Sequence, residues 1–193
     1  QITLVVAPVR GTMQSLISAW YVQNTVWLWF TPIGLAAAYY FVPKVLGKPV
    51  RSYYLAVLGF WSLIVFAGWS GMSRLIGGPI PAWVISSGVV AGVLLIIPIL
   101  VTAINLHLTV LGGIRDAWNS PTLRFVVFGA VAFTLAGVLG SITSLRSIGV
   151  TTQFTHFTAG LSHLGFYGFF TMVMFGSFYF LIPRLLDKEW PSA

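Results

Sequence analysis

The chain has 193 residues, of which 58% are hydrophobic and only 7% are charged. A soluble domain carries about 25% charged residues, so this composition excludes a soluble globular protein and predicts an integral membrane protein. The net charge of +7 does not indicate nucleic-acid binding, because the basic residues lie between apolar stretches, where they orient a membrane protein. The chain has no cysteine, which excludes disulfides and thiolate-held metals within it.

Five apolar stretches are each long enough to cross a bilayer as a helix, which takes about 20 residues. Short connectors rich in proline, glycine and charge separate them, so we expect an all-α, polytopic transmembrane helix bundle that forms one unit over residues 1–193. The chain begins with Gln1 and shows no signal peptide, so we expect it to be processed or to be part of a longer or split subunit. The spans are expected at about residues 13–42, 53–72, 82–111, 122–145 and 154–182.

Basic residues are unevenly divided between the two ends of the predicted bundle. Cytoplasmic loops carry an excess of Lys and Arg, so the richer end is expected to face the cytoplasm. This orientation places the N-terminus outside and the C-terminus in the cytoplasm, as an odd number of spans requires. The richer end holds Lys44, Lys48, Arg51, Arg115, Arg124, Arg184 and Lys188, and the poorer end holds Arg10, Arg74 and Arg146.

Two histidines, His156 and His163, lie in the first turns of the fifth span, in the run QFTHFTAGLSHL. Polar groups are costly in lipid, and a spacing of seven returns to nearly the same helix face, so both are expected to face one interhelical cavity. A neutral imidazole in apolar surroundings is a common axial ligand of heme, and the alternative is a hydrogen bond to a neighbouring helix. For His107, beside Asn105 and Thr109, we expect local hydrogen bonding.

The few acidic residues exclude several functional classes. The chain contains only Asp116, Asp187 and Glu189, all on the predicted cytoplasmic side and away from the histidines of the fifth span. A Ser–His–Asp catalytic set is therefore excluded. The predicted spans contain no carboxylate, so the sequence gives no indication of a proton relay through the membrane. The sequence likewise contains no embedded charge and no broken helix that would indicate a transporter or channel.

Several runs of residues resemble consecutive segments of one family. The run TAGLSHLGFYGFF, followed by FYFLIPRL, is similar to the tenth helix of heme–copper oxidase catalytic subunits, above all cbb-type cytochrome c oxidase subunit I and the nitric oxide reductase large subunit. The upstream runs WYVQNTVWLWFTPIGLAAAYYFVPK, RSYYLAVLGFWSLIVFAGWSG, PAWVISSG and SPTLRFVVFG resemble earlier segments in the same order and spacing. The resemblance covers nearly the whole chain and implies helices six to ten of subunit I, in a bacterial inner membrane.

The chemistry of that family depends on histidines. The resemblance implies a low-spin heme with two histidine ligands and a high-spin heme that faces a copper or non-heme iron held by three histidines. By its match to the run HLGFYG, His163 stands at the ligand of the low-spin heme. Leu161 stands where the ligand of the high-spin heme is expected, and His156 matches no ligand position.

The positions that match the ligands of the second metal also lack histidine. They hold Gln23, Ser73 and Arg74, and Gln153 replaces a further histidine associated with the site. Amide and hydroxyl groups replace imidazole poorly around copper, and a fixed guanidinium repels a divalent cation. No copper is therefore expected, and Arg74 is expected either to fill the emptied site or to pair with a heme propionate.

These observations predict an oxidase-like membrane subunit of a respiratory electron-transfer complex. It would retain a low-spin heme b on His163, with the second ligand on another chain or in a missing N-terminal half; its partners would be the other subunits and the lipid bilayer, not nucleic acid. One alternative is a cofactor-free structural or assembly subunit, with the emptied pocket filled by Leu161, Phe157 and Phe166. The other is a segment of a divergent terminal oxidase or nitric oxide reductase. Catalysis by this chain alone stays open.

Overall fold

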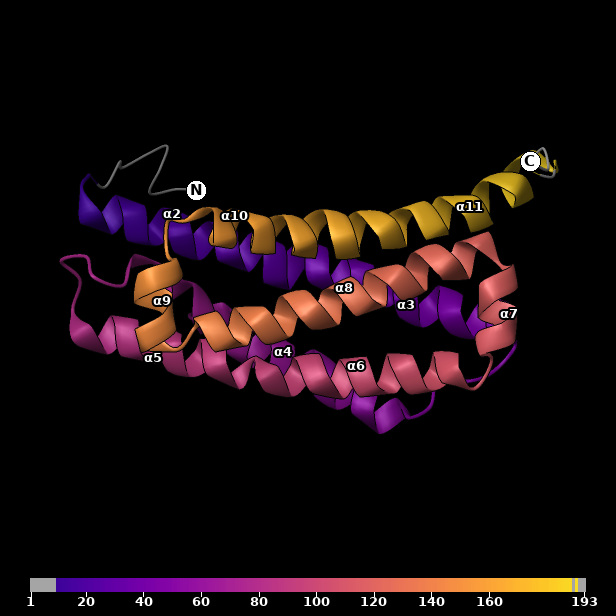
Figure 1. Cartoon of the computed structure of the whole chain (residues 1–193), viewed down its shortest axis with the longest axis horizontal. Coiled ribbons are helices and arrows are strands. Elements are labelled where there is room, and N and C mark those ends of the chain that lie inside the picture. The colour runs from indigo at the N-terminus through magenta and orange to yellow at the C-terminus, as the bar shows by residue number, and fades with distance from the viewer. Residues whose placement is uncertain (1–9, 189, 191–193) are drawn as a thin grey trace.

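A computed structural model describes residues 10–188 and Trp190. Five long helical spans lie side by side along the longest axis of the molecule (Figure 1). All five are long and apolar enough to cross a membrane, so the chain is an all-α integral membrane protein, as predicted. Their bounds lie within four residues of the expected ones: Thr12–Leu46, Tyr53–Leu75, Ala82–Leu111, Pro121–Thr143 and His156–Leu186.

Most spans are assembled from several helical segments, and two connectors contain short helices of their own. The π-helical segments are η1 and η3, and η2 is a 3-10 helix. In chain order the elements are α2 (Thr12–Asn24), η1 (Thr25–Phe30), α3 (Thr31–Leu46), α4 (Tyr53–Ser70), η2 (Gly71–Leu75), α5 (Ala82–Leu94), α6 (Ile96–Leu111), α7 (Ile114–Asn119), α8 (Pro121–Thr143), α9 (Arg146–Thr152), α10 (His156–His163), η3 (Leu164–Thr171) and α11 (Met172–Leu186).

The third span is interrupted at Leu95, between α5 and α6. Leu95 keeps right-handed helical angles, and its amide donates to the Ala91 carbonyl at 3.0 Å, so the irregularity does not break the span. Proline has no amide hydrogen to donate to the carbonyl four residues earlier, so Pro98 removes one bond of the regular helical ladder next to the interruption. The two halves still continue as one membrane-crossing unit.

The two π-helical segments face each other through aromatic rings. Phe30 of η1 packs edge-on against Phe166 and Phe170 of η3, with both pairs of ring centroids 5.1 Å apart. A threonine lies at the C-terminal end of each segment, and its hydroxyl donates to the carbonyl five residues earlier. These bonds run from Thr31 to Val26 over 2.9 Å and from Thr171 to Phe166 over 3.1 Å. The Val26 carbonyl also accepts from the Thr31 amide, so the hydroxyl adds a second bond to that widened turn.

Helix α8 lies at the centre of the bundle and contacts α3, α6, η3 and α11. Glycines bring the neighbouring backbones close to it. A Cβ on Gly129 of α8 would lie 2.7 Å from Val173 Cγ2, and one on Gly176 of α11 would lie 2.8 Å from the Thr122 carbonyl oxygen. Small residues at helix contacts are how membrane helices gain packing energy without a hydrophobic driving force between them.

The end of the bundle that carries α7 is closed by hydrogen bonds between α6 and the connector before α4. Asn105, fully buried, accepts a hydrogen bond from the Ser52 amide at 2.9 Å and donates one to the Ser52 carbonyl at 2.9 Å. The hydroxyl of Thr109 accepts from the Arg51 amide at 3.0 Å. Asn105 and Thr109 therefore hold the connector, and the Thr109 hydroxyl also makes the expected local bond, to the Asn105 carbonyl at 2.7 Å.

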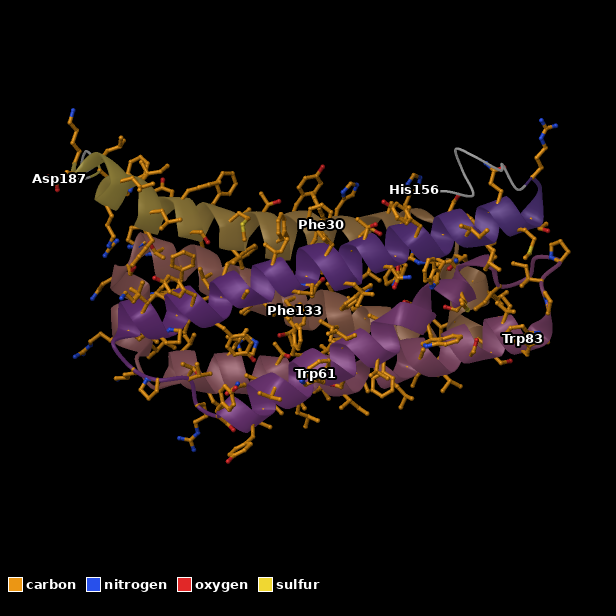
Figure 2. All side chains as sticks on the ribbon, turned by 180° about the vertical axis from the view of Figure 1, so that it is seen from behind. Phe30, Trp61, Trp83, Phe133, His156 and Asp187 are labelled. Atoms are coloured by element: carbon orange, nitrogen blue, oxygen red, sulfur yellow. The ribbon has the colours of Figure 1, made fainter. Side chains whose placement is uncertain are left out.

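The described N- and C-terminal ends of the chain lie at opposite ends of the bundle, as Figures 1 and 2 show. The helix ends and connectors that contain the seven basic residues of the richer set lie at the end with α7 and Asp187. Arg10, Arg74 and Arg146 lie at the end with α9. The charge asymmetry read from the sequence is thus an asymmetry of the folded molecule. A cytoplasmic location of the richer end remains a prediction from the positive-inside rule.

Candidate functional site

A cavity of about 520 Å³ lies in the half of the bundle that carries α9. It is lined by residues of α2, η1, η2, α8, α10 and η3, together with the connectors on either side of α9. Its size falls within the range of about 300–1,000 Å³ that is typical of small-molecule sites. The walls are mainly apolar, with Trp27, Leu95 and Phe133 among them.

All the positions at which the family resemblance places lost metal or heme ligands line this one cavity. They are Gln23 of α2, Ser73 and Arg74 of η2, Gln153 after α9 and Leu161 of α10. These residues are up to 138 positions apart in the sequence, from 23 to 161, and the fold alone brings them together. The correspondence drawn from short motifs therefore describes one location in the structure.

The polar side chains at these positions bond to one another. The guanidinium of Arg74 donates from Nε and Nη2 to Gln23 Oε1, over 3.1 and 2.5 Å. The side-chain amide of Gln153 donates to the main-chain carbonyl of Arg74. The hydroxyl of Ser73 donates to the carbonyl of Ser70 at 2.9 Å. Arg74 therefore links α2 to η2 and to the connector that follows α9.

Two glycines set the spacing of this network. A Cβ on Gly71 would lie 2.8 Å from Gln23 Cβ, so glycine lets α2 approach η2 closely enough for the bond to Arg74. A Cβ on Gly88 of α5 would collide with the backbone amide of Ser73. Gly88 and Gly92 of α5 both serve close packing, because Gly92 likewise abuts the Ser144 side chain.

Nothing in the described part of the chain neutralises Arg74. No salt bridge is formed among the described residues, and the acidic side chain at Asp187 lies at the opposite end of the bundle (Figure 2). A guanidinium has five N–H donors, and Gln23 accepts from two of its nitrogens. The Nη1 group has no hydrogen-bond partner within residues 10–188 and Trp190. The cavity wall thus carries one uncompensated positive charge.

The α8 wall of the cavity consists of small residues. Gly137 and Ser141, and Gly140 and Ser144, are pairs spaced by four, so they lie on one side of α8. Ser141 is only 6% exposed, yet its Oγ has no hydrogen-bond partner. Ser141 was not predicted as a site residue, although the small residues that repeat along this helix could have indicated it.

The emptied pocket is only partly filled by bulky side chains. Leu161 and Phe157 line the cavity, as a cofactor-free subunit would require, but Phe166 instead packs on Phe30 and does not line it. Phe157 is 46% exposed and Phe154 is 83% exposed, while Val22 on α2 is 61% exposed. The cavity therefore reaches the outer surface between α2 and the start of α10.

The two histidines of the fifth span lie outside this cavity. His156 and His163 are both exposed, and neither is among the lining residues. The prediction that they face one interhelical cavity is wrong for the described bundle, because the face of α10 that they occupy points outward (Figure 2 shows His156). His163 stacks on Tyr167 with ring centroids 5.2 Å apart, and it makes no hydrogen bond to a described residue.

His107 forms a bond between helices. Its Nε2 lies 2.9 Å from the hydroxyl of Thr134 on α8. Thr134 also donates to the Ala130 carbonyl at 2.9 Å, so with that donor used the hydroxyl oxygen accepts from the Nε2–H of His107. His107 is a packing residue that joins α6 to α8, and its partner is more distant in the chain than expected.

The donor set at the cavity does not fit a copper or a second heme iron. Leucine has no donor atom, and an arginine beside a glutamine offers positive charge rather than neutral imidazole. No group of three His, Cys, Asp or Glu side chains comes together in the described chain. His163, by contrast, keeps an imidazole on an exposed face of α10, where its ring stacks on Tyr167.

Comparison with known proteins identifies the class. Over residues 2–193 the chain matches the family described as cytochrome C and quinol oxidase polypeptide I, and it belongs to that family. The resemblance to heme–copper oxidase subunit I is thereby confirmed.

Individual relatives are bacterial oxidase subunits. The chain is 31% identical over 179 residues to the Cbb3-type cytochrome c oxidase subunit CcoN1 of Stutzerimonas stutzeri, an alignment that covers 93% of this chain and 38% of the relative. It is 32% identical to cytochrome c oxidase subunit 1 of Rhodobacter capsulatus and 30% identical to a cytochrome c oxidase subunit 1 homolog of Agrobacterium tumefaciens, covering 34% and 33% of them. The chain thus spans roughly a third of the length of these curated relatives.

Proposed function

We propose that this chain is an electron-transfer subunit of a membrane respiratory complex, one that retains a low-spin heme b ligand but no oxygen-reducing centre. The observation that carries the proposal is the contrast between two sites. Every position matched to the second metal or the high-spin heme holds a residue that cannot serve, whereas His163 is present with a free imidazole. Selection that maintained only the low-spin heme site would keep His163 and would allow the ligands of the other site to be lost.

The exposed position of His163 supports a heme shared with another part of the complex. A heme with two imidazole ligands supplies one-electron transfer and needs a second histidine opposite the first. The outward face of α10 leaves room for a second helix to bring that histidine. We infer that the partner is another subunit, or a further part of a longer chain, and that the outer face of α10 and η3 is where it packs.

For Arg74 we propose the role of a site filler rather than that of a propionate partner. Its two hydrogen bonds to Gln23 place a cation where a metal would otherwise be held. A divalent cation would be repelled there, so the arginine and a copper exclude each other. The chain is proposed to be inserted in a bacterial inner membrane with its N-terminus outside, on the basis of its relatives and its charge asymmetry.

The test is a reduced-minus-oxidised visible spectrum of the purified complex, comparing wild type with His163→Ala. A sharp heme b band that disappears in the variant supports the proposal. His156→Ala is the matched control, because it is an exposed histidine on the same helix, and its spectrum should equal that of wild type. An intact complex whose band survives His163→Ala would remove His163 as the ligand.

A cofactor-free structural subunit is the second candidate function. The bonds among Gln23, Arg74 and Gln153 favour it, since they tie together the elements that a metal centre would otherwise hold. A wild-type complex that shows no heme attributable to this chain, yet falls apart when the chain is deleted, would favour this candidate over the first.

A further inference from the structure

We propose that the cavity of the α9 end binds an amphiphile from the bilayer, with an anionic head at Arg74 and an apolar tail along the walls. This ligand class is distinct from heme and from metal ions. The proposal stands on the shape, charge and exposure of the cavity, and it does not depend on whether His163 holds a heme.

The cavity opens on the outer surface of the bundle. Val22, Phe154 and Phe157 line the cavity and are also exposed on the outer surface of a membrane-spanning bundle. An opening with an apolar rim favours the entry of apolar chains over hydrated ions. Molecules that enter through it therefore carry apolar chains, as the lipids of a bilayer do.

The second step is the charge. Arg74 lines the cavity, no described carboxylate pairs with it, and its Nη1 group has no partner. An unpaired guanidinium in a low-dielectric site attracts an anion, and carboxylate and phosphate both suit its planar fork. Because η2 ends the second span, Arg74 lies near the depth of lipid headgroups, where such anions occur.

The third step is an unsatisfied hydroxyl on the opposite wall. Ser141 is buried and its Oγ bonds to nothing in the described structure, although buried polar atoms are nearly always paired. A ligand oxygen that reaches this wall would satisfy it. Gly140 beside it has open space around the position of a Cβ, so the wall has room for a chain to lie against it.

The experiment measures binding of tritiated oleate to the delipidated complex in a non-ionic detergent. Oleate has the proposed anionic head and apolar tail, and methyl oleate has the same tail without the charge. We expect oleate to bind about tenfold more tightly than methyl oleate, because a charge-assisted hydrogen bond to arginine depends on the anion. Equal binding of the two in the wild-type protein would overturn the proposal without the need for any variant.

Variants then place the site. Arg74→Gln should weaken oleate binding about tenfold and leave methyl oleate unchanged. Gly140→Leu, which fills the cavity, should abolish binding of both. The matched control is Arg146→Gln, because Arg146 is an exposed arginine at the same end and does not line the cavity. Oleate binding that persists in Gly140→Leu would contradict the assignment of the cavity.

Competition distinguishes the source of the head. Displacement of oleate by phosphatidylglycerol, but not by phosphatidylcholine, would identify the phosphate of an anionic phospholipid as the natural head; displacement by neither would identify a free fatty-acid carboxylate. Both results support the proposal. Displacement by inorganic phosphate alone would instead show a small-anion site and overturn the amphiphile. None of these outcomes changes the heme spectrum expected from His163, which lies outside the cavity.

Discussion

The two ends of the bundle are made of the same apolar helices and both use close glycine contacts, but the α9 end also holds a cavity. At the α7 end, glycines on α8 and α11 bring backbones into contact and Asn105 closes a connector onto α6. At the α9 end, the small residues of α8 face a cavity, and a cation and a buried hydroxyl line it. One end is specified by contacts within the chain, and the other end has polar groups that the chain does not fully satisfy.

Under the proposed function, this difference explains how the chain would keep its fold without a metal centre. The packing of Gly129 and Gly176 and the closure by Asn105 do not involve the positions where ligands are lost. Substitutions at Gln23 or Leu161 therefore change a cavity wall and leave the interlocked end untouched. Membrane helices held by small-residue contacts do not need a cofactor to associate.

The largest effect is expected at the connector closure. Asn105→Ala leaves the buried amide and carbonyl of Ser52 without their partners, at about 1–3 kcal/mol for each unsatisfied group, so we expect a loss of about 3 kcal/mol in the free energy of unfolding. Equilibrium unfolding of the purified chain in mixed detergent micelles measures it. Ser177→Ala on α11 is the control, because its buried hydroxyl donates within its own helix, to the Val173 carbonyl at 2.8 Å. Equal losses for the two variants would mean that the connector is not held by Asn105.

A matched pair of glycines on α8 tests the packing contrast directly. Gly129→Ala places a Cβ 2.7 Å from Val173 Cγ2 and 3.1 Å from the Phe169 carbonyl oxygen, and such overpacking costs about 2 kcal/mol. Gly140→Ala, on the same helix, meets nothing within 4 Å and gains helix propensity, so its stability should rise slightly. The midpoint of thermal unfolding separates the two. Equal destabilisation by both would contradict the claim that the ends are packed differently.

Much of this architecture follows from hydropathy, because a span of apolar residues has few alternatives in a bilayer. The five spans and the charge asymmetry were predictable on that ground. The π-helical segments were not, since the run TVWLWF has no composition that separates it from an ordinary helix. Each segment has a threonine at its C-terminal end, Thr31 for η1 and Thr171 for η3. The hydroxyl bond that each makes is visible only in three dimensions.

The candidate site was predictable only in part. The motif matches placed Gln23, Arg74 and Leu161 at one centre, and the structure brings them to one cavity. The outward direction of His163 was not predictable, because a period of seven says which residues share a face and not which way that face points. The bond from Arg74 to Gln23 was likewise hidden, since it joins residues 51 positions apart.

A smaller effect is expected at the former metal positions. Gln23→Leu removes the acceptor of the Arg74 guanidinium, and a double-mutant cycle with Arg74→Leu should give a coupling energy of about 1 kcal/mol. The value is set below that of a fully buried charge-assisted bond because Arg74 is only partly buried. A coupling near zero would mean that Gln23 does not hold the arginine, and Arg74 would then be available to another partner.

The smallest effect is expected where His107 joins α6 to α8. Hydrogen bonds between membrane helices contribute about 0.6 kcal/mol, so Thr134→Val should destabilise the bundle by roughly that amount beyond the loss of its own helical bond. Thr143→Val on the same helix provides the reference, because its hydroxyl donates only to the Gly140 carbonyl at 3.0 Å. Each variant loses one bond within α8, and the difference between them isolates the pair with His107. If the two variants unfold alike, the packing of α6 on α8 depends on its apolar and small residues alone. His107 then contributes nothing to the stability of the bundle.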